Sequence, residues 1–165
     1  LAFVPADTSV VSHSDYIQSN EARLRRFARQ IAPADDDTLA VAATICEWVH
    51  ANMTRDEDLR MVRSSDIFRN LRGGHEEYTK LSTALTRSAG IPTQINLGLV
   101  YENGAFDYHS WPSVFVDGLW HDMDPYYGQE RADATHISLF RGDFDRLIEL
   151  IRLFGRFDIT LLDYR

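Results

Sequence analysis

Residues 72–92 read RGGHEEYTKLSTALTRSAGIP, and the architecture of the chain can be worked out from this segment. Two glycines interrupt the chain directly before a run of residues with helical character. Gly90 is a residue often found just past the end of a helix, and Pro92 prevents the helix from continuing. The segment therefore predicts a helix over residues 75–89, with His75 at its N-terminus.

The chain before this segment also has a helical pattern. Apolar residues recur at helical spacing over residues 21–31 and again over residues 37–53. Pro33 closes the first of these helices. A short further helix is expected over residues 65–71, so the first half of the chain is predicted to be helical.

The second half changes to the alternating pattern of strands. Alternation predicts strands over residues 95–101, 105–116 and 119–124, joined by an Asn-Gly and an Asp-Gly turn. Pro112 lies within the second strand and indicates an edge position or a bulge. An amphipathic helix over residues 144–154 and a last strand over residues 157–162 are expected to follow. Helices followed by an antiparallel meander predict an α+β fold.

Composition limits the partners. The 165 residues have a formal net charge of −8, which is a poor match for the phosphates of nucleic acids or an anionic membrane surface. No apolar run is long enough to insert into a membrane. We expect a single domain over residues 1–165, excised from a longer chain, so the sequence does not choose between cell envelope and cytoplasm. The single cysteine, Cys46, excludes an intrachain disulfide.

Three polar residues are candidates for a shared site. His75 starts a helix after two glycines, His109 lies on the second strand, and Asp124 ends the third. If these two strands are neighbours through the Asp-Gly turn, His109 and Asp124 lie close across the ladder. A helix start packed on the strands would then place His75 opposite His109.

Several motifs, in order and with compatible gaps, carry a family resemblance. They are Arg72-Gly73-Gly74-His75-Glu76-Glu77-Tyr78, Ala84-Leu85-Thr86-Arg87-Ser88-Ala89-Gly90-Ile91-Pro92, Tyr108-His109-Ser110-Trp111, Asp117-Gly118-Leu119-Trp120, Asp124-Pro125-Tyr126-Tyr127-Gly128-Gln129 and Ala132-Asp133-Ala134-Thr135-His136-Ile137. Together they resemble the core of bacterial transglutaminase-like domains over nearly the whole chain. The resemblance implies a papain-like core, with a cysteine nucleophile at a helix N-terminus, a histidine base and an orienting aspartate.

Carried over residue by residue, the resemblance makes His109 the base and Asp124 its orienting residue. The nucleophile position is His75, because the Gly-Asp-Cys of the family reads Gly-Gly-His here. An imidazole cannot replace a thiolate in forming a thioester. Cys46 lies within a helix ahead of the motif and is interpreted as a buried, inert thiol. Ordinary thiol acyl transfer is therefore expected to be absent.

The first hypothesis is a metal site made by His75, His109 and Asp124, holding zinc or iron. A helix N-terminus disfavours imidazolium, and a metal ligand must be a neutral imidazole. Asp124 could instead stand behind His109 and only orient it. A further ligand could come from Glu76, Glu77, His121 or water, and no organic cofactor is expected.

Two alternatives stay open. One is a catalytically inactive domain that binds a protein or peptide, or acts as a scaffold. The other is a metal-free hydrolase that uses its histidines as general acid and base. Trp111, on the face of His109, and Glu77 are the residues predicted to line a substrate cleft, and His136 is expected to serve local structure.

Overall fold

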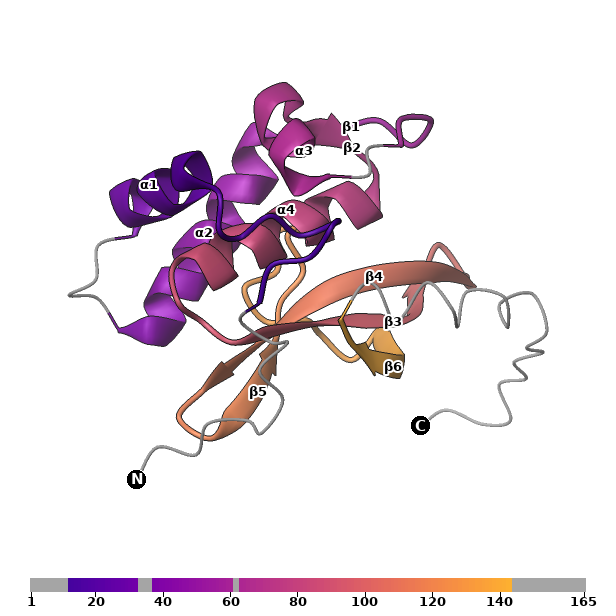
Figure 1. Ribbon diagram of the computed structural model, residues 1–165. Helices are drawn as coiled ribbons and strands as arrows, with labels where there is room; N and C mark the ends of the chain where they lie inside the picture. Colours follow the sequence, from indigo (N-terminus) through magenta and orange to yellow (C-terminus); the bar gives the residue numbers. More distant parts are fainter. Residues whose placement is uncertain (1–11, 33–36, 61–62, 144–165) are drawn as a thin grey trace.

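The computed structural model describes residues 12–32, 37–60 and 63–143, and these form a helical layer on an antiparallel sheet (Figure 1). The helices match the four expected from the sequence and are α1 (Ala22–Ile31), α2 (Thr38–Asn52), α3 (Ser64–Asn70) and α4 (His75–Ser88). The helix expected over residues 144–154 and the strand over residues 157–162 lie outside the described residues.

The main sheet has four strands in the order β5-β4-β3-β6. They are β3 (Thr93–Glu102), β4 (Ala105–Val116), β5 (Leu119–Asp122) and β6 (His136–Gly142). The first three form the predicted meander. β6, which the sequence analysis did not predict, pairs antiparallel with the free side of β3. Its exposed and covered residues do not alternate regularly, so it lacks the period of a half-buried strand.

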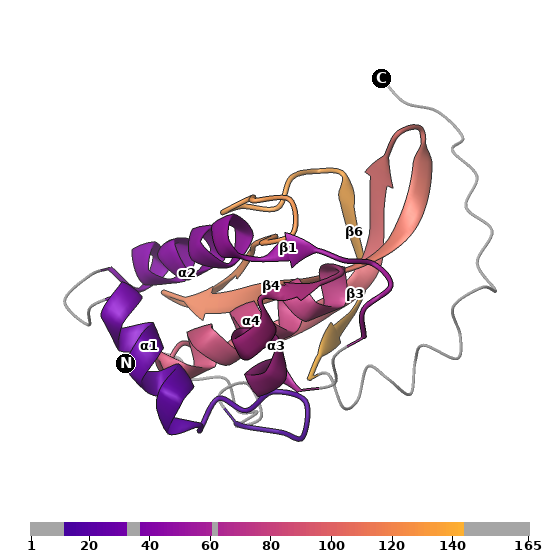
Figure 2. The ribbon, with the colours of Figure 1, turned by 90° about the horizontal axis from the view of Figure 1, so that it is seen from above.

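The core lies between the helices and one face of the sheet. Helix α4 crosses that face, with α1, α2 and α3 packed around it (Figures 1 and 2). The buried apolar side chains come from both layers, among them Ile45, Leu81, Leu85, Ile95 and Val114. The expected α+β architecture of N-terminal helices on an antiparallel meander is confirmed.

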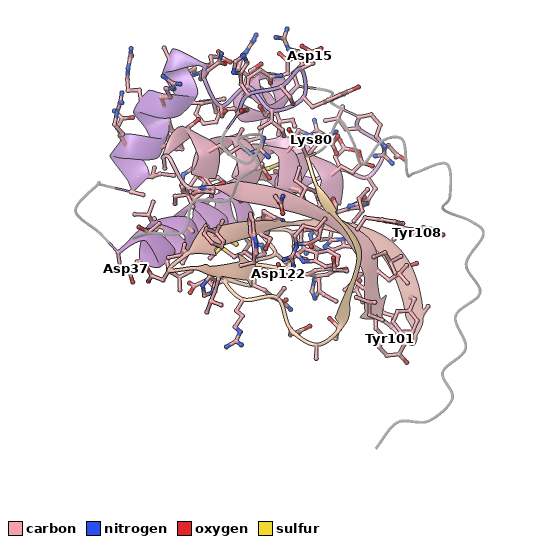
Figure 3. The ribbon with its side chains drawn as sticks, turned by 60° about the horizontal axis from the view of Figure 1, so that its bottom comes forward. Asp15, Asp37, Lys80, Tyr101, Tyr108 and Asp122 are labelled. Carbon is pink, nitrogen blue, oxygen red and sulfur yellow. The ribbon has the colours of Figure 1, made fainter. Side chains whose placement is uncertain are left out.

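Both hairpin turns have the backbone that their residues favour. Asn103 and Gly104 have φ angles of 52° and 86°, and the Asp-Gly pair that joins β4 to β5 has angles of 51° and 83°. The β3–β4 hairpin extends past the helices (Figures 1 and 2) and exposes Tyr101 and Tyr108 near its tip (Figure 3).

The expectation of an edge position for Pro112 is met on one side of its strand. β4 pairs with β3 over residues 105–114 without a bulge, and with β5 only over residues 113–116, so Pro112 lies just beyond the ladder to β5. The proline is tolerated because β5 stops beside it. Met123 donates its backbone N–H to the Pro112 carbonyl at 3.0 Å, and Pro112 has no N–H to return.

A small parallel pair of strands brings an upstream segment to the start of α4. β1 (Thr54–Arg55) pairs with β2 (Arg72–Gly73), with Arg55 opposite Gly73. The next residue, Asp56, donates its backbone N–H to the Gly73 carbonyl at 3.1 Å. Among the described helices, none has the length and apolar character needed to cross a bilayer.

Candidate functional site

The two glycines before α4 are required by how its first turn is built. Glu77 folds back so that its carboxylate accepts the Gly74 backbone N–H at 3.0 Å. Gly73 has a φ of +153°, and a Cβ on it would lie 2.3 Å from the Cβ of Glu77. The helix therefore starts at His75 in a conformation that a side chain at position 73 would prevent.

The tautomer of His75 follows from a chain of hydroxyl groups. Thr79 Oγ1 donates its single proton to the Ser110 carbonyl oxygen at 2.8 Å, and Ser110 Oγ donates its own proton to Thr79 Oγ1 at 3.3 Å. Ser110 Oγ therefore has only lone pairs left to offer His75 Nδ1, which lies 3.1 Å away. Nδ1 of His75 carries the proton, and Nε2 carries the lone pair.

The same ring is neutral at pH 7. Burial is the largest cause that lowers the pKa of His75 from 6.5 to about 4, and the neighbouring imidazole of His109 is the next. The two rings lie with their centroids 5.0 Å apart. The predicted placement of His75 opposite His109 is therefore what the structure has.

His109 and Asp124 form a short, buried hydrogen bond. His109 Nε2 lies 2.6 Å from Asp124 Oδ2, and both side chains are almost completely buried. A carboxylate only accepts, so Nε2 of His109 carries a proton and, in the neutral ring, Nδ1 carries the lone pair. Asp124 thus orients His109 through this hydrogen bond and does not supply a further ligand atom next to His75.

Every side-chain oxygen of Asp124 is used. Oδ2 accepts from His109 and from His136, while Oδ1 accepts the backbone N–H groups of Tyr126 at 2.8 Å and Tyr127 at 3.2 Å. Burial alone would raise the pKa of Asp124, but the hydrogen bonds from His109 and His136 outweigh burial and lower it to about 2. The carboxylate is ionised and its position is fixed by four hydrogen bonds.

His136 is the site residue that the sequence analysis missed. Its Nε2 lies 2.8 Å from Asp124 Oδ2, and its Nδ1 lies 3.4 Å from Asp133 Oδ1. Burial disfavours the charged ring, yet the hydrogen bond to Asp124 and the charge of Asp124 outweigh burial and raise the pKa of His136. The sequence did contain a signal for His136, namely its match to the family motif. Its position next to Asp124, however, depends on the pairing of β6 with β3.

A group of three side chains could hold a metal ion, but it differs from the predicted one. Ligand atoms of His109, Asp124 and His136 all lie within 4.8 Å of one another. Within the described part of the chain His75 is not in such a group. In this structure the three side chains are joined by hydrogen bonds of 2.6 and 2.8 Å.

The end of β1 and the loop after it contact Tyr126, beside the two histidines. The guanidinium of Arg55 lies 4.1 Å from the centroid of the Tyr126 ring and donates to the Tyr126 carbonyl at 2.8 Å. The Tyr126 hydroxyl donates to Glu57 Oε1 at 2.6 Å. The Tyr126 ring also meets His75 edge-on, with centroids 6.4 Å apart. Tyr126 thus connects the exposed Arg55 and Glu57 to the histidines.

The only thiol of the chain does not take part. Cys46 is buried in the core, and its Sγ donates to the Gln129 carbonyl at 3.6 Å. Burial, followed by the charge of Asp124, raises the pKa of Cys46 to about 12. It is a protonated thiol at any physiological pH, in line with its interpretation from the sequence.

The residues predicted to line a substrate cleft are not accessible. Trp111 has 0% of its surface exposed and Glu77 has 1%, because Trp111 packs among His109, His136 and the sheet while Glu77 folds back onto Gly74. Both support the site from behind, which corrects the prediction. Of the suggested further ligands, Glu76 pairs with Lys80 at 3.4 Å. His121 lies on β5 and lines a separate cavity against α2.

Comparison with solved structures identifies the fold. A candidate cysteine protease from Cytophaga hutchinsonii has a TM-score of 0.73 at 19% identity, covering 86% of this chain and 50% of that protein. The periplasmic domain of TgpA from Pseudomonas aeruginosa has a TM-score of 0.55 at 18% identity, covering 75% and 49%. A candidate protease from Parabacteroides distasonis has a TM-score of 0.51 at 15% identity, covering 66% and 24%. The chain thus spans half or less of each neighbour.

The sequence comparison is more specific about family. No curated protein matches the chain as a relative. The family model of the transglutaminase-like superfamily, however, matches residues 25–125, which include His75, His109 and Asp124 and make up more than half of the chain. With its helices, its antiparallel sheet and its histidine–aspartate pair in place, the chain belongs to the transglutaminase-like superfamily.

Proposed function

We propose that this domain performs no thiol acyl transfer and instead binds a divalent transition metal ion, zinc or iron, between His75 and His109, with Asp124 as the residue that orients His109. The observation that carries the proposal is the direction of the hydrogen bonds. His75 Nδ1 donates to Ser110 and His109 Nε2 donates to Asp124. In its neutral form each ring therefore keeps one nitrogen lone pair for a ligand.

This arrangement has the form that metal sites use. A histidine that binds zinc commonly donates its other ring N–H to a carboxylate or another acceptor, which holds the tautomer and the ring orientation. Asp124 accepts the ring N–H of His109 in this way, and Ser110 accepts the ring N–H of His75. Two imidazoles suit Zn²⁺ or Fe²⁺, with water and further protein oxygens completing the coordination. An ion bound here could act as a Lewis acid in place of the missing thiolate.

The group of His109, Asp124 and His136 is the other place for an ion, and the hydrogen bonds argue against it. An ion there would have to displace the protons that both rings share with Asp124 Oδ2. It would also have to compete with proton binding to His136, because the hydrogen bonds and charges of Asp124 and Asp133 outweigh burial and raise the pKa of that ring. The site between His75 and His109 requires neither change.

The test is the metal content of protein purified without chelator, measured by elemental analysis. We expect close to one equivalent of zinc or iron in the wild type, loss of the metal in His75→Ala, and retention in His136→Gln, with circular dichroism as the check on folding. A wild type with less than about a tenth of an equivalent, and no thermal shift on adding Zn²⁺ or Fe²⁺, would exclude the proposal. Loss in His136→Gln with retention in His75→Ala would move the ion to the other group.

A second candidate function is metal-free binding of a polypeptide in the site. It is favoured by the complete set of four hydrogen bonds on Asp124, which holds the site together without an ion. Two fold neighbours described as candidate proteases are also consistent with a polypeptide ligand. Panning a displayed peptide library on chelator-treated protein tests it, with His75→Trp to fill the mouth. Binders that keep full affinity for His75→Trp would contradict this function.

A further inference from the structure

We infer that a cavity next to the turn of the β3–β4 hairpin binds the guanidinium group of an arginine side chain on a polypeptide ligand. This hairpin cavity has a volume of about 200 Å³ and is lined by residues 100–102 of β3 and by residues of the segment 127–135. The inference goes beyond the metal proposal and rests on the second candidate function, the metal-free binding of a polypeptide. It requires neither a metal ion nor a thiol.

Two hydrogen bonds hold the walls of the hairpin cavity together. Tyr101 donates its backbone N–H to the Thr135 carbonyl at 3.0 Å, which fixes the segment 127–135 against β3. The Tyr127 hydroxyl donates to Glu102 Oε2 at 2.7 Å. The two walls are therefore in contact with each other, and the cavity is formed before a ligand arrives.

The lining of the hairpin cavity is negatively charged. It contains the carboxyl groups of Glu102 and Asp133, and none of the described residues that line it is a lysine or an arginine. Hydrogen bonds from Thr135 lower the pKa of Asp133, which keeps this carboxyl group ionised at neutral pH. An acidic chain, with a formal net charge of −8, also attracts a basic ligand. The cavity therefore favours a cation.

Both carboxylates can still accept hydrogen bonds from a ligand. Tyr127 donates to Oε2 of Glu102, which leaves Oε1 as an acceptor. Oδ1 of Asp133 accepts from Thr135, whereas Oδ2 accepts from Gln129 Nε2 at 3.0 Å and has a second lone pair. The acceptors come from opposite walls, so a donor with several N–H groups can use both.

Two aromatic rings select among cations. Tyr101 and Tyr127 both line the hairpin cavity, and Tyr101 is 44% exposed at the end of the hairpin (Figure 3). A guanidinium stacks on aromatic rings and its planar set of N–H donors matches carboxylates, whereas an ammonium is a compact, strongly hydrated charge. The combination of tyrosines with carboxylates therefore favours arginine over lysine.

The size and the position of the hairpin cavity favour a polypeptide as the source of the guanidinium. Sites for whole small molecules have volumes of about 300 to 1,000 Å³, so a smaller cavity suits a single side chain. Tyr127 also contacts His109, with ring centroids 5.2 Å apart. An arginine bound here would therefore lie beside the histidines, and the rest of its chain could continue across them.

Two exposed glutamates provide a matched pair of variants. Glu102→Gln removes a charge from the hairpin cavity and keeps an amide oxygen that can accept from Tyr127. Glu130→Gln removes an equal charge from the segment 127–135, but Glu130 lines the separate cavity against α2. Tyr101→Leu is a third variant, which removes one aromatic ring. All three residues are exposed, so the substitutions should leave the fold intact.

The experiment is a titration of chelator-treated, ¹⁵N-labelled protein followed by two-dimensional NMR. The probe is a blocked pentapeptide with arginine between two pairs of glycines, compared with the same peptide carrying lysine or citrulline, the neutral isostere of arginine. Blocked arginine alone tests whether a polypeptide is needed. A cation–π contact and a hydrogen bond to a charged group together contribute at least about 10-fold in affinity.

We expect the arginine peptide to bind at least about 10-fold more tightly than the citrulline peptide, and more tightly than the lysine peptide or blocked arginine. Amide signals of residues 100–102 and 127–135 should shift. Glu102→Gln should lose about 10-fold in affinity for the arginine peptide, and Tyr101→Leu several-fold. Glu130→Gln should bind as the wild type does.

The outcomes separate this inference from the function on which it rests. Equal affinity for the arginine and citrulline peptides would overturn the inference, as would equal weakening in Glu102→Gln and Glu130→Gln, because the effect would then be one of general charge. Blocked arginine that binds as tightly as the pentapeptide would overturn the polypeptide as the source. Binding that depends on Glu102 but is unchanged in His75→Trp would support the hairpin cavity and contradict a polypeptide that crosses the histidines.

Discussion

His136 lies 2.8 Å from the same carboxylate oxygen of Asp124 that accepts from His109, so one buried oxygen connects two imidazoles. Asp124 has no exposed surface and is ionised, because the hydrogen bonds from His109 and His136 lower its pKa to about 2. Burial disfavours a charged His136 ring, but the hydrogen bond to Asp124 and the charge of Asp124 outweigh burial and raise the pKa of His136, which favours its protonated form beside the carboxylate. The contact between His136 and Asp124 therefore helps to stabilise the negative charge of Asp124 in the site.

Replacement of His136 should therefore destabilise the protein. His136→Ala removes one of the four hydrogen bonds to the buried, ionised Asp124 carboxylate, and breaking a buried pair in this way costs about 3 kcal/mol. Urea unfolding followed by circular dichroism measures the change. His121→Ala, on the separate face of β5, is the control and should change the free energy of unfolding by less than about 1 kcal/mol. Equal stability of the two variants would contradict the assigned role.

The stability of the metal-free protein should depend on pH through His75. A histidine whose pKa is about 4 when folded and 6.5 when unfolded binds protons more tightly in the unfolded chain. Its contribution is complete above pH 6.5 and is lost as the pH falls from 6.5 towards 4, at up to about 1.4 kcal/mol per pH unit. Urea unfolding of wild type and His75→Gln across this window isolates the effect, which should be missing from the variant. Parallel pH profiles would show that the ring is not held neutral.

A thiol placed at residue 75 should be reactive, while Cys46 is not. In His75→Cys the introduced thiol would stand at the N-terminus of α4 beside His109, and both features lower a thiol pKa. Cys46 is buried with its pKa raised to about 12. Alkylation with iodoacetamide at pH 7, followed by peptide mass spectrometry, should therefore label residue 75 first and leave Cys46 unmodified. Equal labelling of both positions would contradict the arrangement of the site.

Gly73 should be far less tolerant of substitution than Gly142. At Gly73, φ is +153° and a Cβ would lie 2.3 Å from the Glu77 Cβ, whereas a Cβ on Gly142 meets no atom within 4 Å. We expect Gly73→Ala to cost about 2 kcal/mol or more, because strain and the clash with Glu77 add. Gly142→Ala should stay within about 0.5 kcal/mol. Thermal unfolding of both variants gives the comparison, and similar melting temperatures would be inconsistent with the described turn.

Local signals in the sequence were enough to predict the helices and the meander. Glycine and proline mark the ends of α4, and the Asn-Gly and Asp-Gly pairs form the two hairpin turns with the positive φ angles they favour. The hairpin that joins β4 to β5 brings the end of β5 close to the part of β4 that carries His109, which is why the pairing of His109 with Asp124 could be predicted, although Asp124 itself lies beyond the ladder. Each of these features depends on residues close together in the chain.

The missed features depend on contacts between distant segments. In the sequence β6 follows β4 and β5, yet it pairs with β3, which precedes them. Only that pairing brings His136 close to Asp124. Glu57 reaches Gly74 through the short parallel pairing of β1 with β2. The burial of Trp111 likewise results from packing against His136 on β6. The local sequence pattern does not indicate which distant segments come into contact.

Pro112 lies where the ladder between β4 and β5 ends. It accepts one hydrogen bond from Met123 and, as a proline, returns none, so the ladder between β4 and β5 cannot close beyond this point. After Met123 the chain leaves this ladder, and Asp124 pairs with Gln129 in an isolated bridge while its carboxylate contacts His109. The residue at which the strand pairing ends is thus followed directly by the residue that orients His109.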